Sequence, residues 1–132
     1  MPNSTRPTTL GLRHIALCVN NLEACEHFYT EIVGMRIEWK PDADNVYLTS
    51  GSDNLALHRT TENFQAGTAQ RLDHMGFIIK TPELVDQWHD FLIANKVKIK
   101  NPPKTHRDGA RSLYCLDPED NLVQFIYHPP LA

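Results

Sequence analysis

The sequence predicts an α+β domain built from two tandem βαβββ modules, whose mostly antiparallel strands form a curved mixed sheet around a shared cavity. Two observations lead to this prediction. An apolar stretch with a histidine at its third position occurs twice, at residues 12–19 and 72–79. Each copy is followed by a helix signal and then by three short strand-like stretches. A repeat of about 60 residues indicates an internal duplication, since solenoid repeats are shorter.

The composition fits one compact domain. Hydrophobic residues make up 41% of the chain and the formal net charge is −3, so neither nucleic acid nor an anionic membrane surface is the expected partner. No apolar run has the roughly 20 residues that a membrane-spanning helix needs, and the first residues lack the apolar segment of a signal peptide. We therefore expect a cytoplasmic protein whose partner is a small molecule or another protein. Three cysteines without a CxxC spacing argue against disulfides, and all three are expected to be buried.

The first module is expected at residues 11–58, after a loose terminus at residues 1–10. Its strand 12–19 is followed by a helix whose N-cap lies at Asn20–Asn21 and whose end is marked by Gly34. Strands are then expected at residues 35–39, 46–49 and 55–58, with turns at 41–45 and 51–54. The apolar stripe of the helix consists of Leu22, Cys25, Phe28, Tyr29, Ile32 and Val33.

The second module is expected at residues 72–128, after a polar linker at 59–71. Strand 72–79 precedes a helix that Thr81 caps, and Asn95 is a candidate left-handed residue at the end of this helix. The following strand, 97–100, is expected to be broken by Asn101, Pro102 and Pro103. Strands 111–116 and 122–128 are joined by a turn at 117–121, and residues 129–132 form a tail.

Strand alternation predicts which side chains share the cavity face, because successive residues of a strand point to opposite faces. The predicted face has a few polar groups among apolar ones, as small-molecule sites do. We expect Trp39, Trp88 and Tyr29 to belong to the core instead. The residues predicted on the cavity face are His14, Ala16, Cys18, Ala56, His58, His74, Gly76, Ile78, Ser112, Tyr114, Leu122, Gln124 and Ile126.

Three motifs, taken together, resemble the vicinal oxygen chelate superfamily, which includes glyoxalase I, fosfomycin-resistance proteins, extradiol dioxygenases and bleomycin-binding proteins. The first motif is the LxH opening of both repeats, at residues 12–14 and 72–74. The second is the FYxxxxGM segment at residues 28–35. The third is the SxYxxDPxxN run at residues 112–121. The resemblance covers nearly all of residues 11–128.

The resemblance implies a divalent metal, with Fe, Zn, Mn and Ni as candidates, held by His14, His74 and Gln124. Glutamate is usual at the position of Gln124, and the fourth-strand glutamate of glyoxalases corresponds to Ala56. The resemblance therefore argues against authentic glyoxalase I activity. Two histidines and one oxygen ligand form a facial set that leaves open positions for a chelating substrate. Histidines that only line a ligand pocket are the alternative.

Further residues are candidates for contacts with the substrate. His58 could complete a three-histidine site, act as general base or lie at the cavity rim. Ser112 and Tyr114 correspond to pocket residues of the fosfomycin-resistance branch, and we expect His58 and Tyr114 to be catalytic. Lys104 and Arg111 flank a basic loop, residues 104–111, that could recognise a carboxylate or phosphonate. A solvated loop is the alternative for that segment.

Two functions are compatible with these residues. The first is a metal-dependent enzyme, either dioxygenase-like or fosfomycin-resistance-like, that acts on a small molecule with vicinal oxygens. The second is a metal-free protein of the bleomycin-resistance type that binds an antibiotic or another aromatic molecule. The paired histidines favour the first function, while Gln124 and Ala56 favour the second. The resemblance also implies a homodimer.

Overall fold

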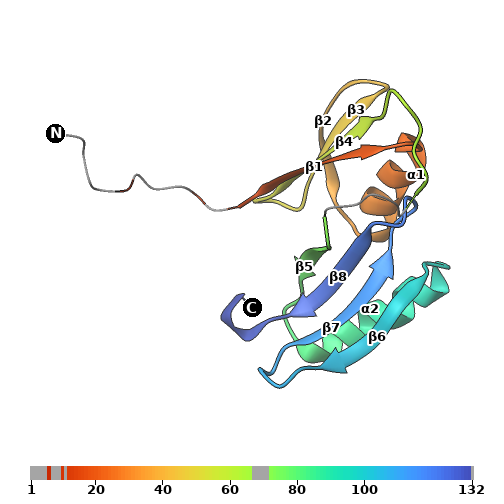
Figure 1. Ribbon diagram of the computed structural model, residues 1–132. Helices are drawn as coiled ribbons and strands as arrows, with labels where there is room; N and C mark the ends of the chain where they lie inside the picture. Colours follow the sequence, from red (N-terminus) through yellow and green to blue (C-terminus); the bar gives the residue numbers. More distant parts are fainter. Residues whose placement is uncertain (1–5, 7–9, 11, 67–71, 132) are drawn as a thin grey trace.

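Two four-stranded mixed sheets, each with one helix, form the fold (Figure 1). The computed structural model describes residues 6, 10, 12–66 and 72–131. The predicted terminus therefore lies mostly outside the described residues, as does part of the predicted linker. The strand order is β1-β4-β3-β2 in the first sheet and β5-β8-β7-β6 in the second. The α+β prediction with two tandem βαβββ units is confirmed.

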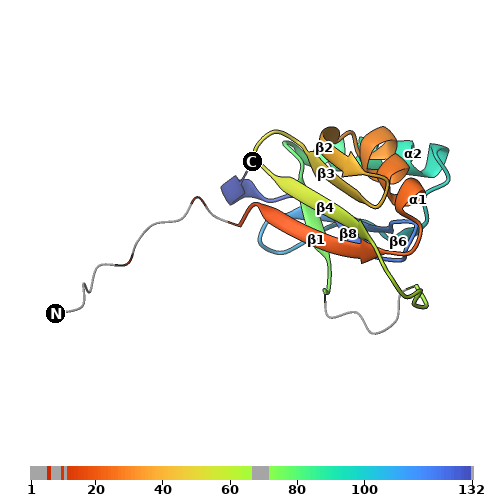
Figure 2. The ribbon, with the colours of Figure 1, turned by 90° about the horizontal axis from the view of Figure 1, so that it is seen from above.

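The first sheet contains β1 (His14–Val19), β2 (Arg36–Asp42), β3 (Asn45–Thr49) and β4 (Asn54–Arg59). Figure 2 looks down on this sheet and shows the four strands side by side. β1 pairs with β4 in parallel, while the other pairs are antiparallel. The parallel register places His14 opposite Asn54 and Cys18 opposite His58. The side chains of His14, Asn54 and His58 therefore lie on one face.

The second sheet repeats this arrangement with β5 (Met75–Ile78), β6 (Ile99–Thr105), β7 (Arg111–Leu116) and β8 (Leu122–Tyr127). β5 is shorter than the predicted strand at 72–79, so that His74 lies immediately before the strand. Gly76 lies opposite Gln124 in the parallel pair β5–β8. Tyr114 lies opposite Gln124 in the antiparallel pair β7–β8.

The prediction that residues 101–103 break the second strand of the second module is wrong. β6 continues through Pro102 and Pro103 to Thr105, with register shifts on either side of Asn101. β6 is the edge strand of its sheet. A proline on an edge strand can direct its missing N–H away from the neighbouring strand, so no ladder bond is lost. The same reason explains why Pro41 lies within β2, which is also an edge strand.

The first helix begins as α1 (Leu22–His27) and continues as a π-helical turn, η1 (Phe28–Ile32). The side chain of Asn21 caps α1 by accepting the N–H of Ala24 at 3.0 Å. In the wider turn, the N–H of Val33 donates to the carbonyl of Phe28, five residues earlier. Gly34 then ends the segment at φ +98°, as predicted, in the left-handed region that suits glycine.

The second helix, α2 (Pro82–Ala94), packs on the second sheet, and Thr81 caps it. Asn95 has φ −96°, and Lys96 instead takes the left-handed conformation, at φ +61°. The prediction of a left-handed Asn95 is therefore wrong by one residue. The side chain of Asn95 bonds back to the carbonyl of Phe91 at 2.9 Å, which stabilises the last turn. No helix in the described part of the chain is long and apolar enough to cross a membrane. The short helix η2 (Pro129–Leu131) follows β8.

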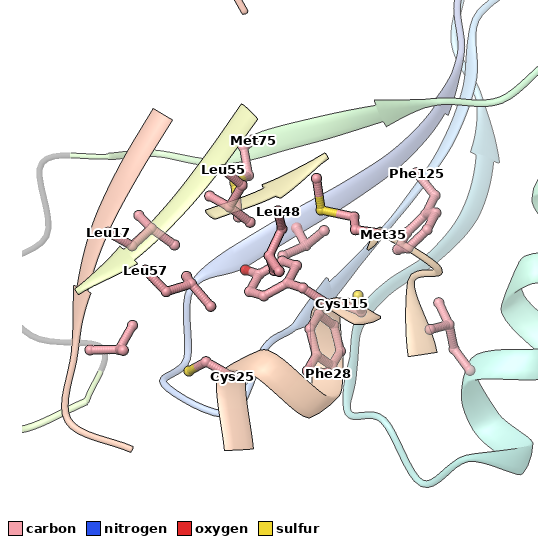
Figure 3. Packing of buried hydrophobic residues seen from close by; sticks show 14 of the residues in the cluster. Leu17, Cys25, Phe28, Met35, Leu48, Leu55, Leu57, Met75, Cys115 and Phe125 are labelled. Atoms are coloured by element: carbon pink, nitrogen blue, oxygen red, sulfur yellow. The ribbon is translucent and has the colours of Figure 1, made fainter. Parts of the chain in front are cut away.

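One hydrophobic core joins both modules. Figure 3 shows labelled side chains from β1, the first helix and β3 to β5 gathered with Cys115 and Phe125 of the second sheet. Tyr29 belongs to this core and Trp88 packs against it, as predicted. Trp39 does not, because it is 57% exposed on β2 and stacks on Tyr47. Alternation identifies residues that share a face, but it does not reveal whether another element covers that face.

A buried hydrogen-bond network also links the modules. The Tyr29 hydroxyl donates to the Asp117 carboxylate at 2.6 Å. The same carboxylate accepts the backbone N–H groups of Glu119 and Asn121, at 2.8 Å each. Glu119 in turn accepts the N–H of Asn20 at 2.7 Å, at the start of α1. The turn at 117–121 thus holds the first helix of the other module.

Replacing Tyr29 by Phe should destabilise the fold without disturbing its apolar packing. Burial and the neighbouring Asp117 carboxylate raise the pKa of Tyr29 well above its usual value, so its hydroxyl remains a donor. Loss of a hydrogen bond to a buried charged group costs roughly 1.5–3 kcal/mol. Urea denaturation should show this loss. The control is Tyr127→Phe, because Tyr127 is half-buried and its hydroxyl has no partner among the described residues.

The three cysteines differ in exposure: Cys25 and Cys115 are buried, while Cys18 is exposed. The prediction that all three are buried is thus wrong for Cys18, which lies on the open face of β1. Burial raises the pKa of the Cys115 thiol to about 12 and that of Cys25 still further. We therefore expect a thiol reagent at pH 8 to modify one cysteine in the native chain and three after denaturation. Rapid modification of two or three thiols in the native chain would contradict this burial.

Candidate metal and substrate site

A cavity of about 640 Å³ lies between the two modules. The beginnings of β1 and β4 form one side of it, and β5 with the middle of β8 forms the other. The predicted ligand residues His14, His74 and Gln124 all contribute to its lining. The structure thus brings together three residues that are far apart in the sequence.

His14 opens β1 and is oriented by its neighbour on β4. Its Nδ1 lies 2.7 Å from Oδ1 of Asn54, which is its partner in the strand register. An amide oxygen only accepts, so Nδ1 carries the proton of this bond. The neutral ring then has its free lone pair on Nε2. Asn54 is itself fixed, because its Nδ2 donates to Glu38 at 3.1 Å.

His74 is arranged in the same way, from the other module. Its Nδ1 lies 2.6 Å from Oδ2 of the Asp73 carboxylate, which leaves the lone pair of the neutral ring on Nε2. The ring also meets the ring of Tyr114 edge to face, with centroids 5.2 Å apart. Two contacts therefore hold the imidazole of His74 in place.

Gln124 completes the group from the centre of the second sheet. It is 9% exposed, and its Nε2 donates to the hydroxyl of Tyr114 at 2.9 Å. This bond fixes the amide so that Oε1 is the free end. Oε1 lies beside Gly76, where a Cβ would approach it to 3.4 Å. The glycine therefore leaves the oxygen accessible from β5.

These donors suit a divalent transition metal. Imidazole lone pairs with a hydrogen bond on the opposite ring nitrogen are the usual form of histidine ligands. An amide oxygen can serve as a third ligand, but it brings no negative charge. Among the described residues, no group of three or more His, Cys, Asp or Glu side chains is placed to hold a metal. A metal here therefore depends on the glutamine.

His58 lies further along the same face, outside the cavity lining. Its Nδ1 is 2.6 Å from Oδ1 of Asn45, and its ring packs against Tyr47. β4 places it four residues beyond Asn54, roughly 13 Å along the strand. Ala56, between them, is fully buried. The described geometry thus separates His58 from the two other histidines.

The remaining predicted substrate-binding residues lie towards the β6–β7 hairpin. Ser112 is buried, and its Oγ lies 3.1 Å from Nε2 of His106. Arg111 pairs with Asp86 of α2 at 2.7 Å, so its charge is directed to the helix-covered side of the sheet. Lys104 lines a second cavity. None of the three lines the cavity that contains His14 and His74.

Sequence reasoning missed Asn54 and Asp73, the two partners of the histidines. Asn54 was assigned to a turn because asparagine is a common turn residue, yet it is the first residue of β4. The parallel register that pairs it with His14 follows from the tertiary structure and has no local sequence signal. Asp73 did have a signal, because it is adjacent to His74 in the repeated strand opening.

Two tandem βαβββ modules, with a cavity between them that two histidines line, define the fold class of the chain. The family model described as the glyoxalase/bleomycin resistance protein/dioxygenase superfamily matches residues 11–125. The chain belongs to this superfamily, and the resemblance inferred from its motifs is confirmed.

Solved structures support the same fold. An integron cassette protein from the mobile metagenome of the Halifax Harbour sewage outfall is 28% identical, with a TM-score of 0.74 over 91% of this chain and 100% of that chain. A glyoxalase/dioxygenase from Nostoc punctiforme is 24% identical, with a TM-score of 0.78 over 98% and 99%. Lactoylglutathione lyase from Agrobacterium tumefaciens is 20% identical, with a TM-score of 0.75 over 92% and 96%.

Proposed function

We propose that the chain is a metal-dependent enzyme in which His14, His74 and Gln124 hold a divalent metal and a small molecule with vicinal oxygens occupies the remaining positions. One observation carries this proposal. The two histidines and the glutamine line a single cavity, and each has its other polar end bound to a neighbouring side chain. Side chains that only lined the cavity wall would not need hydrogen bonds that orient each of them in the same way.

The chain's own residues would position the ligands. Asn54 and Asp73 bind Nδ1 of the two histidines, so that the lone pair of each neutral ring is on Nε2, and Tyr114 holds the amide of Gln124. Met35, Leu55, Met75 and Phe77 give the cavity apolar walls that limit the access of water. A divalent ion bound there supplies Lewis-acid polarisation of the substrate oxygens. Tyr114 acts in this proposal as a positioning residue.

Lactoylglutathione lyase activity is not part of this proposal. The predicted positions for its two glutamates are Ala56 and Gln124 in this chain, and neither side chain can transfer a proton as a carboxylate does. Neutral metal ligands such as His14, His74 and Gln124 are compatible with dioxygenase-like chemistry. They are also compatible with fosfomycin-resistance-like transfer of a group to a small molecule. The homodimer and the cytoplasmic location stay predictions.

Metal titration of the chelator-treated chain tests the proposal. Mn²⁺, Fe²⁺, Ni²⁺ and Zn²⁺ should be added separately and followed by calorimetry. We expect at least one of these ions to bind with a stoichiometry of one per chain. The control is His89→Ala, since His89 lies on α2 outside the cavity. This variant should bind the same ion with unchanged affinity.

A chain that binds none of these ions contradicts the enzyme proposal and favours the alternative, a metal-free binding protein. The neutral side chains of Gln124 and Ala56 favour that alternative. Its positive test is binding of an aromatic, antibiotic-like molecule to the metal-free chain, measured by calorimetry.

A further inference from the structure

A cavity that contains none of the candidate metal ligands lies where the first helix meets the end of α2. Its volume is about 490 Å³, and we call it the helix-end cavity. Three segments line it, namely the first helix between residues 24 and 32, residues 95–98 after α2, and the β7–β8 connection between residues 116 and 120. This volume falls within the range of small-molecule sites. Both modules therefore contribute walls to a space large enough for a small ligand.

The backbone around the helix-end cavity is irregular in three places. Among the described residues, Lys96 and Asp120 are the only non-glycine residues with positive φ, at +61° and +62°, and both line the cavity. The π-helical turn η1 supplies two more lining residues, Phe28 and Ile32. Left-handed non-glycine residues and π-helical turns are uncommon and concentrate at functional sites. All three irregularities meet at a cavity that the proposed metal site does not use.

Lys96 occupies a position that glycine would fill with less strain. It follows Asn95, the C-cap of α2. The N–H of Lys96 donates to the carbonyl of Ile93 at 3.0 Å. The N–H of Val97 donates to the carbonyl of Leu92 at 3.0 Å. Helices that end in this way usually have glycine at the left-handed residue, because a side chain there adds strain. The lysine therefore places a cation at the cavity against the preference of the backbone.

The exposed charges of the helix-end cavity leave an excess of one positive charge. Lys96 and Lys98 are exposed, and neither forms a salt bridge with any residue in the described part of the chain. Asp120 is the one exposed carboxylate of the lining. His27, exposed at the end of α1, adds an imidazole. A monoanion would therefore balance the fixed charges at the rim of the cavity.

The other carboxylate of the lining, that of Asp117, is buried and fully occupied. Its Oδ2 accepts the hydroxyl of Tyr29 at 2.6 Å and the side-chain amide of Asn121 at 2.9 Å. Its Oδ1 accepts the backbone N–H groups of Glu119 and Asn121, at 2.8 Å each. Four donors of the chain thus stabilise this charge, and no acceptor position is left for a ligand.

Much of the remaining lining is apolar. Phe28 and Ile32 of η1 face Val97 and Leu116 of the second module across the helix-end cavity. Phe28 is buried and the three others are half-buried. An apolar group that enters the cavity is removed from water, which favours binding. Since the cavity combines apolar walls with a cationic rim, its ligand should have an apolar part and an anionic part.

We propose that the helix-end cavity binds a small carboxylate with an apolar body. Lys96 and Lys98 hold the carboxylate, and Phe28 and Val97 contact the apolar body. A carboxylate carries the single negative charge that balances the rim. The ligand contacts both modules, and it raises the melting temperature because it binds only the folded chain. The inference does not depend on the metal site, since the two cavities share no lining residue.

Nuclear magnetic resonance titrations of the full chain with phenylacetate and hexanoate test this inference. We expect saturable shifts of backbone amides within residues 27–32, 95–98 and 116–120 with at least one of the two probes. Acetate lacks the apolar body, while phenylacetamide and hexanamide lack the charge. Each of these three should bind roughly tenfold or more weakly, because the ligand needs both parts. A neutral amide that binds as tightly as its carboxylate would overturn the inference.

The double variant Lys96→Gly/Lys98→Ala should lose roughly tenfold or more in affinity for the carboxylate probe, since both cations are removed. Its melting temperature without ligand should not fall, because glycine relieves the left-handed backbone at residue 96. Lys100→Ala is the matched control, because Lys100 is exposed on β6 and does not line the cavity. Its affinity should stay within about twofold of the wild type, as for surface charges away from the ligand.

Titrations without saturable shifts in these three segments would overturn the inference, as would a double variant that binds the probe like the wild type. Shifts confined to residues 12–15 and 74–78 would place the probe in the first cavity and would also overturn it. The metal titration tests the proposed function separately, because none of the helix-end residues is a candidate metal ligand.

Discussion

Alanine at position 14 or at position 74 is expected to weaken metal binding by a similar large factor. Each module contributes one imidazole to the cavity, and a single ion would need both. Loss of a residue that only orients a ligand already costs 10–100-fold in affinity, so loss of the ligand itself should cost roughly 100-fold or more. Calorimetry of the two variants with the ion that the wild type binds best measures this effect.

The comparison between the two variants is as informative as the size of the loss. An ion held by His14 alone, or by His74 with Asp73, would leave one variant close to the wild type. Such an asymmetric result would contradict a site shared by both modules. His89→Ala again serves as the control for removing an imidazole from the surface. Thermal denaturation of each variant should confirm that its fold remains intact.

Glutamate in place of Gln124 is expected to tighten binding of Mn²⁺ or Fe²⁺. The glutamine oxygen faces the cavity beside Gly76 without a formal charge, and a carboxylate would place a unit charge there. Charges about 4 Å apart interact by roughly 4 kcal/mol at an effective dielectric constant of 20, and desolvation offsets part of this. A gain of roughly tenfold or more in affinity is therefore expected.

The surroundings of residue 124 can accept this substitution. In the wild type, the amide of Gln124 donates to the hydroxyl of Tyr114. A carboxylate only accepts, but the tyrosine hydroxyl can turn and donate to it, so no buried group is left unsatisfied. Gln87→Glu controls for the added charge, because Gln87 is exposed on α2. Equal or weaker metal binding by Gln124→Glu would show that Oε1 is not a ligand.

The repeated strand opening was enough to predict both modules and the shared face of three side chains, while their role as candidate ligands was implied by the resemblance to the vicinal oxygen chelate superfamily. His14 and His74 occupy equivalent positions of a duplicated strand, and Gln124 falls on the matching face of the last strand. These predictions rest on alternation, which is local. The side chains of all three do line one cavity, as the face assignment requires.

Other features depend on tertiary context and could not be predicted in this way. Asn54 orients His14 only because β1 and β4 pair in one particular register. Pro102 and Pro103 fit within β6 because that strand is at the edge of its sheet. The exposure of Cys18 and Trp39 depends on which face of the first sheet is covered. A sequence pattern contains none of this information.

The most direct test of the central claim is the position of a bound metal. A crystal grown with Co²⁺ or Zn²⁺ should be measured at the absorption edge of that metal, so that anomalous scattering locates the ion. We predict one peak per chain in the cavity between the modules, bonded to Nε2 of His14, Nε2 of His74 and Oε1 of Gln124. A peak bonded through Nδ1, or one that contacts the histidine of only one module, would contradict the account.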